Sequence, residues 1–327
     1  MGMIANKVQK KAFGITYLPN KVVLITGGSK GLGLVLAEQL IKEECFVAIC
    51  ARDEEELSRA KEHLRETGAD IYTHVCDVSD RKQVEVLIDS VIHHFGKLDI
   101  VINNAGTIMV GPMETFGPED YKKAMDVMYW GIANTTLSVL PYMKKRRQGH
   151  IVNITSIGGK VSVPHLLPYN SSKFAAVGFS EGIAAELRKD HIYVSTIVPW
   201  LMRTGSYVNA YFQKGNRKEF KLFSFMSSTP LLTLSAETAA SKIIEAIKEK
   251  QAFKVIGIQA RMAIEFHHFF PNLTPKIFSL LSRFIPASLE ETALETGKEI
   301  TDRSDDAEVV GIRKFGKKAQ EEHQTFS

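Results

Sequence analysis

The sequence predicts an α/β fold in which helices cover both faces of a parallel β-sheet. Short runs rich in β-branched residues alternate with longer segments of helical spacing over most of the chain. Most of the short runs are continuously apolar, which is typical of strands buried on both faces of a parallel sheet. Right-handed crossovers between such strands produce a doubly wound, three-layer sandwich whose ligands bind beyond the carboxyl ends of the strands.

The expected elements follow one another in strand–helix order. We expect strands at residues 22–26, 46–50, 71–76, 98–102, 150–154, 193–198 and 253–256. We expect the main helices at residues 32–42, from 54 onward, up to about 94, from 118 to about 147, 168–189 and 236–250. Asp53 is placed to cap the second of these helices, with Glu56 reaching back to it in a capping box.

The bulk composition narrows the function classes. An apolar fraction of 44% and a net charge of +4 fit a globular protein and give no reason to expect nucleic acid as a partner. The three cysteines, Cys45, Cys50 and Cys76, form no Cys-x-x-Cys pair, so we expect neither a disulfide framework nor a metal site. No apolar core of a secretory signal and no run of 18 apolar residues occur, which favours a cytoplasmic protein.

A glycine-rich loop directly follows the first expected strand. Residues 26–33 read Thr-Gly-Gly-Ser-Lys-Gly-Leu-Gly and lead into a helix. Glycines at this point permit a tight turn and close approach of the backbone to a ligand, and the free N–H groups of the helix attract a pyrophosphate. The residues expected to contact a dinucleotide here are Gly27, Ser29, Lys30, Gly31, Leu32 and Gly33.

The end of the second strand bears on which dinucleotide is bound. Arg52, together with Lys30, offers cations where the 2′-phosphate of NADP(H) would lie, so we expect NADP(H). Asp53 keeps NAD(H) open as the less favoured alternative, because an acid at this end can hold a ribose hydroxyl. Further contacts are expected after the third and fourth strands, from Asp77 and Val78 and from Asn104, Ala105 and Gly106.

Three polar residues form the expected reacting group. Ser156 follows the fifth strand, and Tyr169 and Lys173 are four residues apart on the next helix, so they share one helical face. An ammonium beside the phenol favours the ionised form and lowers the pKa of the tyrosine, which can then exchange a proton with a substrate oxygen. The serine hydroxyl can hold the same oxygen.

On these residues the chain resembles the short-chain dehydrogenase/reductase family. The matching motifs are TGGSKGLG (26–33), NNAG (103–106), Ser156 in NITSIGG, and Tyr169 and Lys173 in YNSSK, within residues 20–257. The resemblance implies a single Rossmann domain of seven parallel strands and hydride transfer between nicotinamide and a carbonyl or secondary alcohol. It implies that Tyr169 is the acid/base, that Ser156 orients the carbonyl, and that Lys173 also binds the nicotinamide ribose. It further implies cofactor contacts from Pro199 and Thr204, and a homodimer or homotetramer.

Two positions depart from the family pattern. Met128 stands where the family usually has an asparagine that helps to hold a water near the lysine, and Asn134 lies too far around the helix to replace it. Trp200 stands where a glycine usually follows Pro199. These changes keep a second hypothesis open, in which the chain is an NADP-binding sensor or scaffold with weak or no turnover.

The segment between Thr204 and Ser235 is expected to form a substrate lid. Its many aromatic residues favour a bulky apolar or lipid-like substrate, although they could instead pack the lid against its own domain. We expect Ser156, His165, Trp200 and Tyr207 to line the substrate pocket.

The remaining chain is expected to form an extension. We assign residues 1–257 to the catalytic domain, with 1–20 as an N-terminal arm, and 258–327 to a helical extension with a partly disordered tail. Residues 258–286 are rich in large apolar side chains and predict one or two helices. These helices could cover the pocket, extend a dimer interface or lie on a membrane surface.

Overall fold

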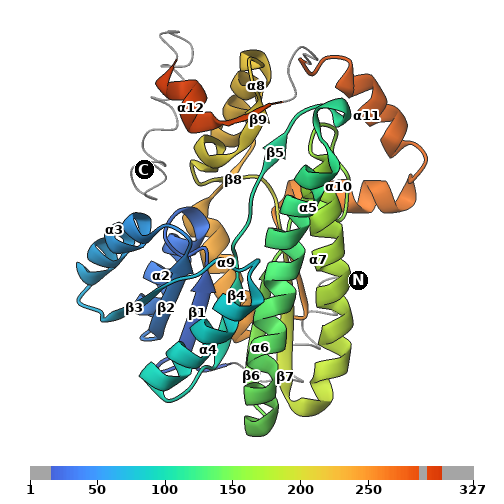
Figure 1. Cartoon of the computed structure of the whole chain (residues 1–327). Helices are drawn as coiled ribbons and strands as arrows, with labels where there is room; N and C mark the ends of the chain where they lie inside the picture. Colours follow the sequence, from blue (N-terminus) through green and yellow to red (C-terminus); the bar gives the residue numbers. More distant parts are fainter. Residues whose placement is uncertain (1–15, 287–292, 304–327) are drawn as a thin grey trace.

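The computed structural model describes residues 16–286 and 293–303, and it confirms the predicted fold class (Figure 1). In the described part of the chain the central sheet has seven strands, in the order β3-β2-β1-β4-β6-β7-β11, and every neighbouring pair is parallel. The strands are β1 (Val22–Thr26), β2 (Phe46–Ala51), β3 (Ile71–Val75), β4 (Ile100–Asn103), β6 (Gly149–Ile154), β7 (Ile192–Pro199) and β11 (Phe253–Ile256). The order reverses between β1 and β4, which is the place where a doubly wound sheet binds its ligand.

Helices cover both faces of this sheet. One face carries α2 (Gly31–Lys42), α3 (Glu54–Arg65) and α9 (Ala236–Lys248), and the other carries α4 (Arg81–Phe95), α6 (Gly131–Arg146) and α7 (Leu167–Leu187). Alternate residues of β1 point to opposite faces: Val23 and Ile25 join the first core, and Val22 and Leu24 join the second. This two-sided burial explains why the strand is apolar at every position except the last.

The long helix predicted from residue 118 to about 147 is interrupted. The chain forms α5 (Pro118–Met125), then a π-helical turn, η2 (Asp126–Trp130), and then α6. A π-helical turn inserts a residue into the helical ladder, and such turns are frequent at functional sites. Here the turn contains Met128, whose side chain is fully buried.

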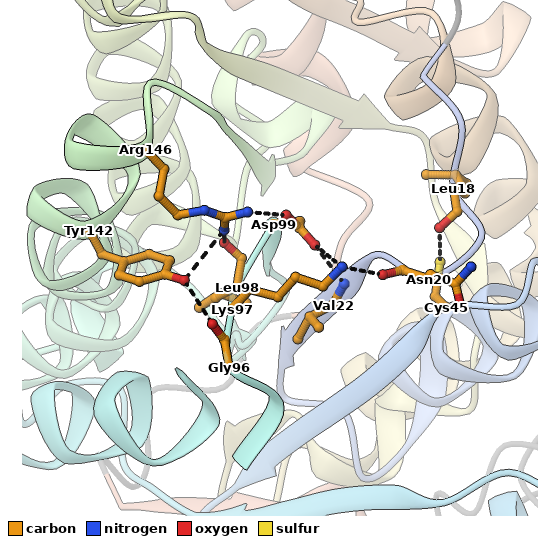
Figure 2. A network of polar contacts seen from close by, with 10 residues as sticks. All are labelled: Leu18, Asn20, Val22, Cys45, Gly96, Lys97, Leu98, Asp99, Tyr142 and Arg146. Carbon is orange, nitrogen blue, oxygen red and sulfur yellow. Dashed lines mark hydrogen bonds and ion pairs between the residues drawn. The ribbon is translucent and has the colours of Figure 1, made fainter. Parts of the chain in front are cut away.

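A buried carboxylate ties the sheet together at the end opposite the carboxyl ends of the strands (Figure 2). Asp99 accepts hydrogen bonds from the backbone N–H of Val22 at 3.0 Å and from the Arg146 guanidinium at 3.1 Å. The ammonium of Lys97 lies 3.5 Å from the same carboxylate. The start of β1, the start of β4 and the end of α6 are therefore held by charge-assisted contacts, which are about twice as strong as neutral hydrogen bonds.

Two small sheets and several short elements stand above the central sheet. One small sheet has the order β12-β9-β5 and the other pairs β10 with β8. Their strands are β5 (Met109–Val110), β8 (Met202–Arg203), β9 (Tyr211–Gln213), β10 (Leu234–Ser235) and β12 (Leu294–Thr296). The short helices are η1 (Met113–Thr115), η3 (Ile157–Gly159), η4 (Arg188–Asp190) and η5 (Ser206–Asn209), and the lid helix is α8 (Arg217–Ser228).

The extension forms the two helices that the sequence suggested, α10 (Ile258–Phe269) and α11 (Thr274–Ser282). Within the expected tail, residues 293–303 have regular structure. These residues form β12, which pairs antiparallel with β9, and α12 (Gly297–Asp302). Ile300 of α12 packs into the apolar core of the lid, so this part of the extension completes the lid. Residues 1–15 of the expected arm, and 287–292 and 304–327 of the expected extension, lie outside the described residues.

Candidate active site

A cavity of about 640 Å³ lies at the carboxyl ends of the central strands, where the topology predicted a ligand site. Of the predicted residues, the cavity is lined by Gly27, Ser29, Lys30, Gly31, Leu32, Arg52, Asp77, Val78, Asn104, Ala105, Gly106, Tyr169, Lys173 and Thr204. Gly33, Pro199, Ser156, His165, Trp200 and Tyr207 are not among its lining residues. The cavity lining therefore includes most of the expected cofactor residues and none of the four expected substrate-pocket residues.

The glycine loop has the shape of a phosphate cradle. Gly27 and Gly31 adopt φ angles of +62° and +57°, which favour glycine. A Cβ added to Gly33 would lie 2.2 Å from the carbonyl oxygen of Gly27, so only glycine allows α2 to start this close to the loop. Lys30 precedes α2 without a side-chain cap, which leaves the first N–H groups of the helix free of a protein side chain. These features fit a pyrophosphate group.

The loop is held in place by the turn after β4. The Asn104 amide donates to the carbonyl oxygens of Thr26 and Gly27 at 3.1 and 3.0 Å. The backbone N–H groups of Asn104 and Ala105 donate to the hydroxyl of Thr26 at 3.0 and 3.1 Å. Asn104 therefore positions the cradle as well as lining the cavity, which explains the use of an amide at this point.

The carboxylate of Glu56, which we expected in a capping box with Asp53, lies at the outer end of the glycine loop beside Lys30. Asp53 caps α3 by accepting from the Glu56 N–H at 2.8 Å, but Glu56 does not return the contact, so the predicted capping box is wrong. The Glu56 side chain instead contacts Lys30 Nζ at 2.5 Å and accepts from the Ser29 hydroxyl at 3.2 Å. Lys30 also donates to the side-chain oxygen of Asn209 at 3.0 Å. Arg52, an exposed residue, lines the same region.

The loop after β3 lines the cavity with Asp77 and Val78. The Asp77 carboxylate accepts from the backbone N–H and the hydroxyl of Ser79 at 2.9 and 2.7 Å, which fixes the turn. The Asn134 amide of α6 donates to the carbonyl oxygen of Val78 at 3.0 Å. Asn134 is thus engaged with this loop, and it does not reach the site of Lys173.

Ser156, Tyr169 and Lys173 converge at the inner end of the cavity. Ser156 lies between β6 and η3 and accepts from the Gly158 N–H at 3.1 Å, while Tyr169 and Lys173 project from α7. The Lys173 ammonium donates to the carbonyl oxygen of Ile154 at 3.0 Å and lies 5.7 Å from the centre of the Tyr169 ring. A Cβ on Gly106 would lie 4.0 Å from that ammonium, so the turn after β4 closes over the lysine.

The electrostatics of this group differ from our expectation. Burial raises the pKa of Tyr169 above its usual value, and a hydrogen bond with Ser156 offsets only part of this effect. Burial also lowers the pKa of Lys173 to about 8. The expectation that Lys173 lowers the pKa of the tyrosine is therefore not met in this state of the protein. The lysine is held by Ile154, and desolvation dominates for both groups.

Met128 occupies the space beneath the same turn. Its Cγ lies 3.9 Å from where a Cβ on Gly106 would be, and the side chain is fully buried. The thioether therefore fills, by packing, the position where the family pattern has an amide.

The expected substrate residues have other surroundings. Tyr207 belongs to the apolar core of the lid, with Phe212 and Phe220, so it packs the lid against itself. The Trp200 ring packs in a cluster with α10 and α11, and its Nε1 donates to the carbonyl oxygen of Leu232 at 2.8 Å. Trp200 therefore joins the extension to the catalytic domain, away from the cavity lining.

His165 has a structural partner in the lid. Its Nδ1 is in close contact with the Glu219 carboxylate of α8, which is almost completely buried. Glu219 also accepts from the Asn216 amide at 2.8 Å. His165 has a φ of +63° and lies four residues before Tyr169. The pair thus fixes the lid helix relative to the segment that leads into the catalytic helix.

Several lining residues were missed by the sequence interpretation. These are Ala51, Glu56, Cys76, Thr107, Ile108, Val127, Ile154, Thr155, Met202, Ser206, Asn209 and Ala210, whereas Asp53, considered above for a ribose hydroxyl, also lines the cavity. Val127 and Met202 place apolar groups in the cavity. Each lies close in sequence to a residue that the motifs had already identified, and this proximity could have indicated that it lines the cavity. Glu56 and Asn209 reach the cavity through contacts that no local pattern reveals.

The described residues contain neither a metal-binding cluster nor a membrane-spanning helix. No group of three or more His, Cys, Asp or Glu side chains within residues 16–286 and 293–303 could hold a metal ion. None of the helices in those ranges is long and apolar enough to cross a membrane.

The comparisons with known proteins agree with the geometry. The family model for short chain dehydrogenases matches residues 21–213. A dehydrogenase/reductase SDR family protein 7-like from Anopheles gambiae is 32% identical over 272 residues, covering 81% of this chain and 84% of that protein. A putative ketoacyl reductase from Streptomyces coelicolor is 35% identical over 187 residues, covering 57% of this chain and 72% of that protein.

Among solved structures, a short chain dehydrogenase/reductase from Burkholderia phymatum in complex with NAD superimposes with a TM-score of 0.72 at 25% identity. The match covers 79% of this chain and 96% of that one. With the fold, the glycine cradle and the Ser–Tyr–Lys group in place, the chain belongs to the short-chain dehydrogenase/reductase family of oxidoreductases.

Proposed function

We propose that this protein is an NADP(H)-dependent reductase that transfers hydride to the carbonyl carbon of a bulky, apolar or lipid-like ketone. The observation that carries the proposal is the placement of Tyr169 and Lys173 in the same cavity as the glycine cradle, with Ser156 hydrogen-bonded to Tyr169. This arrangement puts a proton donor at the inner end of a dinucleotide-shaped site.

The phenol of Tyr169, protonated near neutral pH, suits the role of the acid in a reduction. A tyrosine that stays protonated near neutral pH can donate its proton to the carbonyl oxygen as the carbon is reduced. The Ser156 hydroxyl holds that oxygen and the phenol in line. Lys173, whose ammonium lies 5.7 Å from the centre of the Tyr169 ring, is placed to bind the nicotinamide ribose. A bound nicotinamide would supply the hydride, and this hydride together with the proton from Tyr169 converts the ketone to an alcohol.

The outer end of the cradle supports NADP(H) over NAD(H). Lys30 and Arg52 both line the cavity there and suit the 2′-phosphate. The Glu56 carboxylate is bound to Lys30, so a 2′-phosphate has to displace it or share the lysine with it. Asp53 and Glu56 both line this region, so the preference for the phosphate rests on Lys30 and Arg52 contacting it together.

The substrate proposal rests on the apolar lining and on one relative. Ile108, Val127 and Met202 line the cavity near the reacting group. One relative is named as a putative ketoacyl reductase. A 3-oxoacyl chain carries the ketone and apolar surface that this cavity suits.

The proposal is tested by following NADPH oxidation with 3-oxoacyl thioesters of four to sixteen carbons. We expect turnover whose kcat/KM increases with chain length, and NADH should be a poorer cofactor. NADPH binding without turnover across this series and a general panel of ketones and aldehydes would favour the sensor or scaffold hypothesis instead.

We also propose that two copies associate through α6 and α7, as the family pattern implies. Large apolar side chains are exposed on this side of the molecule, at Trp130, Leu137 and Phe174. Covering them in a dimer removes apolar surface from water. Sedimentation of wild type and a Leu137→Glu/Phe174→Glu variant tests this: the variant should sediment as a smaller species.

A further inference from the structure

The two extension helices are apolar on the side that faces away from the protein. Ile258, Met262 and Phe269 of α10 are 71%, 66% and 69% exposed, and Phe284 beyond α11 is 78% exposed. The exposed large apolar positions are 258, 262, 266, 269 and 270, and then 273, 277, 280, 281 and 284. Eight of them, all but 270 and 281, follow one another at spacings of three and four residues. This periodicity places each set on one face of its helix. We call these eight side chains the outer face.

The opposite side of the same helices is already packed. Ala260, Ala263 and Ile264 of α10 and Phe278 of α11 contact the cluster around Ile157, Val161 and Trp200. A helix in a water-soluble protein needs only one apolar stripe to hold it on the core. The outer face is therefore additional to what the fold requires, and an exposed apolar patch of this kind marks an interaction site.

Charge distinguishes the possible occupants of the outer face. Residues 258–286 carry three permanent cations, Arg261, Lys276 and Arg283, against one carboxylate, Glu265. All four residues are exposed. Two copies pairing through this face would bring six cations together with only two carboxylates, which is unfavourable. An anionic lipid surface instead complements the cations, each contributing about 1 kcal/mol near such a surface.

The helices also have dimensions that suit lying on a bilayer. α10 has 12 residues and α11 has 9, and neither crosses a membrane. Amphipathic helices of this kind rest in the interface with their apolar side chains among the upper acyl groups. Figure 1 shows α10 and α11 at the end of the molecule that also carries α8 and β9.

We propose that the outer face of α10 and α11 is a docking surface for an anionic lipid bilayer. The apolar side chains enter the interface, and Arg261, Lys276 and Arg283 contact lipid headgroups. The face is attached to the lid, because the Asn216 amide at the start of α8 donates to the carbonyl oxygen of Pro286 at 3.3 Å. Docking therefore brings the lid to the bilayer surface.

The proposal is tested by flotation of the full chain with vesicles, a measurement that needs no catalytic turnover. Vesicles of phosphatidylcholine alone are compared with vesicles containing 30 mol% phosphatidylglycerol. We expect wild type to bind the anionic vesicles at least tenfold more strongly than the neutral ones. Phe269→Ser/Phe284→Ser and Lys276→Glu/Arg283→Glu should each weaken this binding at least tenfold.

Matched controls separate docking from folding. Val86→Ser/Met113→Ser removes two exposed apolar side chains elsewhere, and Lys82→Glu reverses an exposed charge on α4; both should bind like wild type. Thermal unfolding of every variant verifies the fold. The proposal is overturned if wild type does not bind anionic vesicles, if it binds neutral ones equally well, or if the outer-face variants bind unchanged. It is also overturned if Phe269→Ser/Phe284→Ser converts a dimer into a monomer without changing vesicle binding.

Discussion

The ammonium of Lys30 lies 2.5 Å from the carboxylate of Glu56, which places an acid inside the region where a cofactor phosphate is proposed to bind. Glu56 is largely buried and also accepts from Ser29, so it is fixed in this position. We therefore predict that Glu56 affects how the glycine loop discriminates between NADPH and NADH.

The first prediction concerns cofactor preference. Glu56→Gln removes a negative charge that competes with the 2′-phosphate for Lys30, so KM for NADPH should fall about three- to tenfold, as for a loss of about 1 kcal/mol of repulsion. KM for NADH should stay unchanged or rise, since NADH has no phosphate to benefit. Glu54→Gln, an exposed acid at the start of the same helix, is the control and should change neither value. A weaker affinity for NADPH in Glu56→Gln would contradict this role.

The second prediction concerns the buried lysine. Burial lowers the pKa of Lys173 to about 8, so its charged form destabilises the folded state. Lys173→Met removes this charge, so the free energy of unfolding should rise by about 1–3 kcal/mol at pH 7 while activity is lost. Below about pH 8 the lysine is charged in both states, and burial costs stability. Between pH 8 and its usual value of 10.5 the native state loses the proton first, so the advantage of the variant should shrink. Urea unfolding at pH 7 and pH 10 measures this change. Equal differences at both pH values would argue against it.

The third prediction concerns acid stability. Burial lowers the pKa of His150 to about 3 from its usual 6.5, and its Nε2 lies 2.8 Å from the Ser195 hydroxyl. Between these values the unfolded chain binds a proton that the native state does not, so stability contributed by neutral His150 is lost as the pH falls below 6.5. Between pH 6.5 and pH 5 the free energy of unfolding of the wild type should fall by about 2 kcal/mol more than that of His150→Gln. His93→Gln, at an exposed site on α4, should follow the wild type.

The fourth prediction concerns the lid. Glu219→Gln weakens the contact between α8 and His165, so the lid should be held less firmly over the segment that precedes Tyr169. KM for the ketone should rise severalfold while KM for NADPH stays constant, and stability should fall by about 1–3 kcal/mol because a buried charged contact is lost. Steady-state kinetics with each substrate varied separately distinguish these effects. An equal rise in both KM values would show that the pair supports the whole cavity rather than the lid.

The sequence predicted the parts of the site that depend on local patterns. The glycine loop, the Asn104 turn and the Tyr169/Lys173 spacing each lie within one turn or one helix, so their geometry follows from chain direction alone. The seven-stranded sheet was predictable because most of its strands are short, largely apolar runs that alternate with segments of helical spacing.

The parts that the sequence did not predict depend on contacts between distant segments. The local sequence predicted that Glu56 contacts Asp53 in a capping box. Only the folded chain shows that the Glu56 carboxylate contacts the ammonium of Lys30 instead. His165 and Glu219 are 54 residues apart, and no periodicity links them. Trp200 was assigned to the pocket by its place in a motif, whereas the extension helices supply the apolar surface that its ring contacts.

The claim that Tyr169 protonates a ketone as it accepts hydride is tested most directly by single-turnover reduction with (4-²H)NADPH. In wild type we expect deuterium at the alcohol carbon by mass spectrometry. In Tyr169→Phe the rate of transfer should fall by a factor of about 10² to 10⁴, the usual contribution of a general acid. Tyr193→Phe, on β7 and outside the cavity lining, should keep the wild-type rate. A Tyr169→Phe enzyme that transfers deuterium at the wild-type rate while binding NADPH normally would contradict the account.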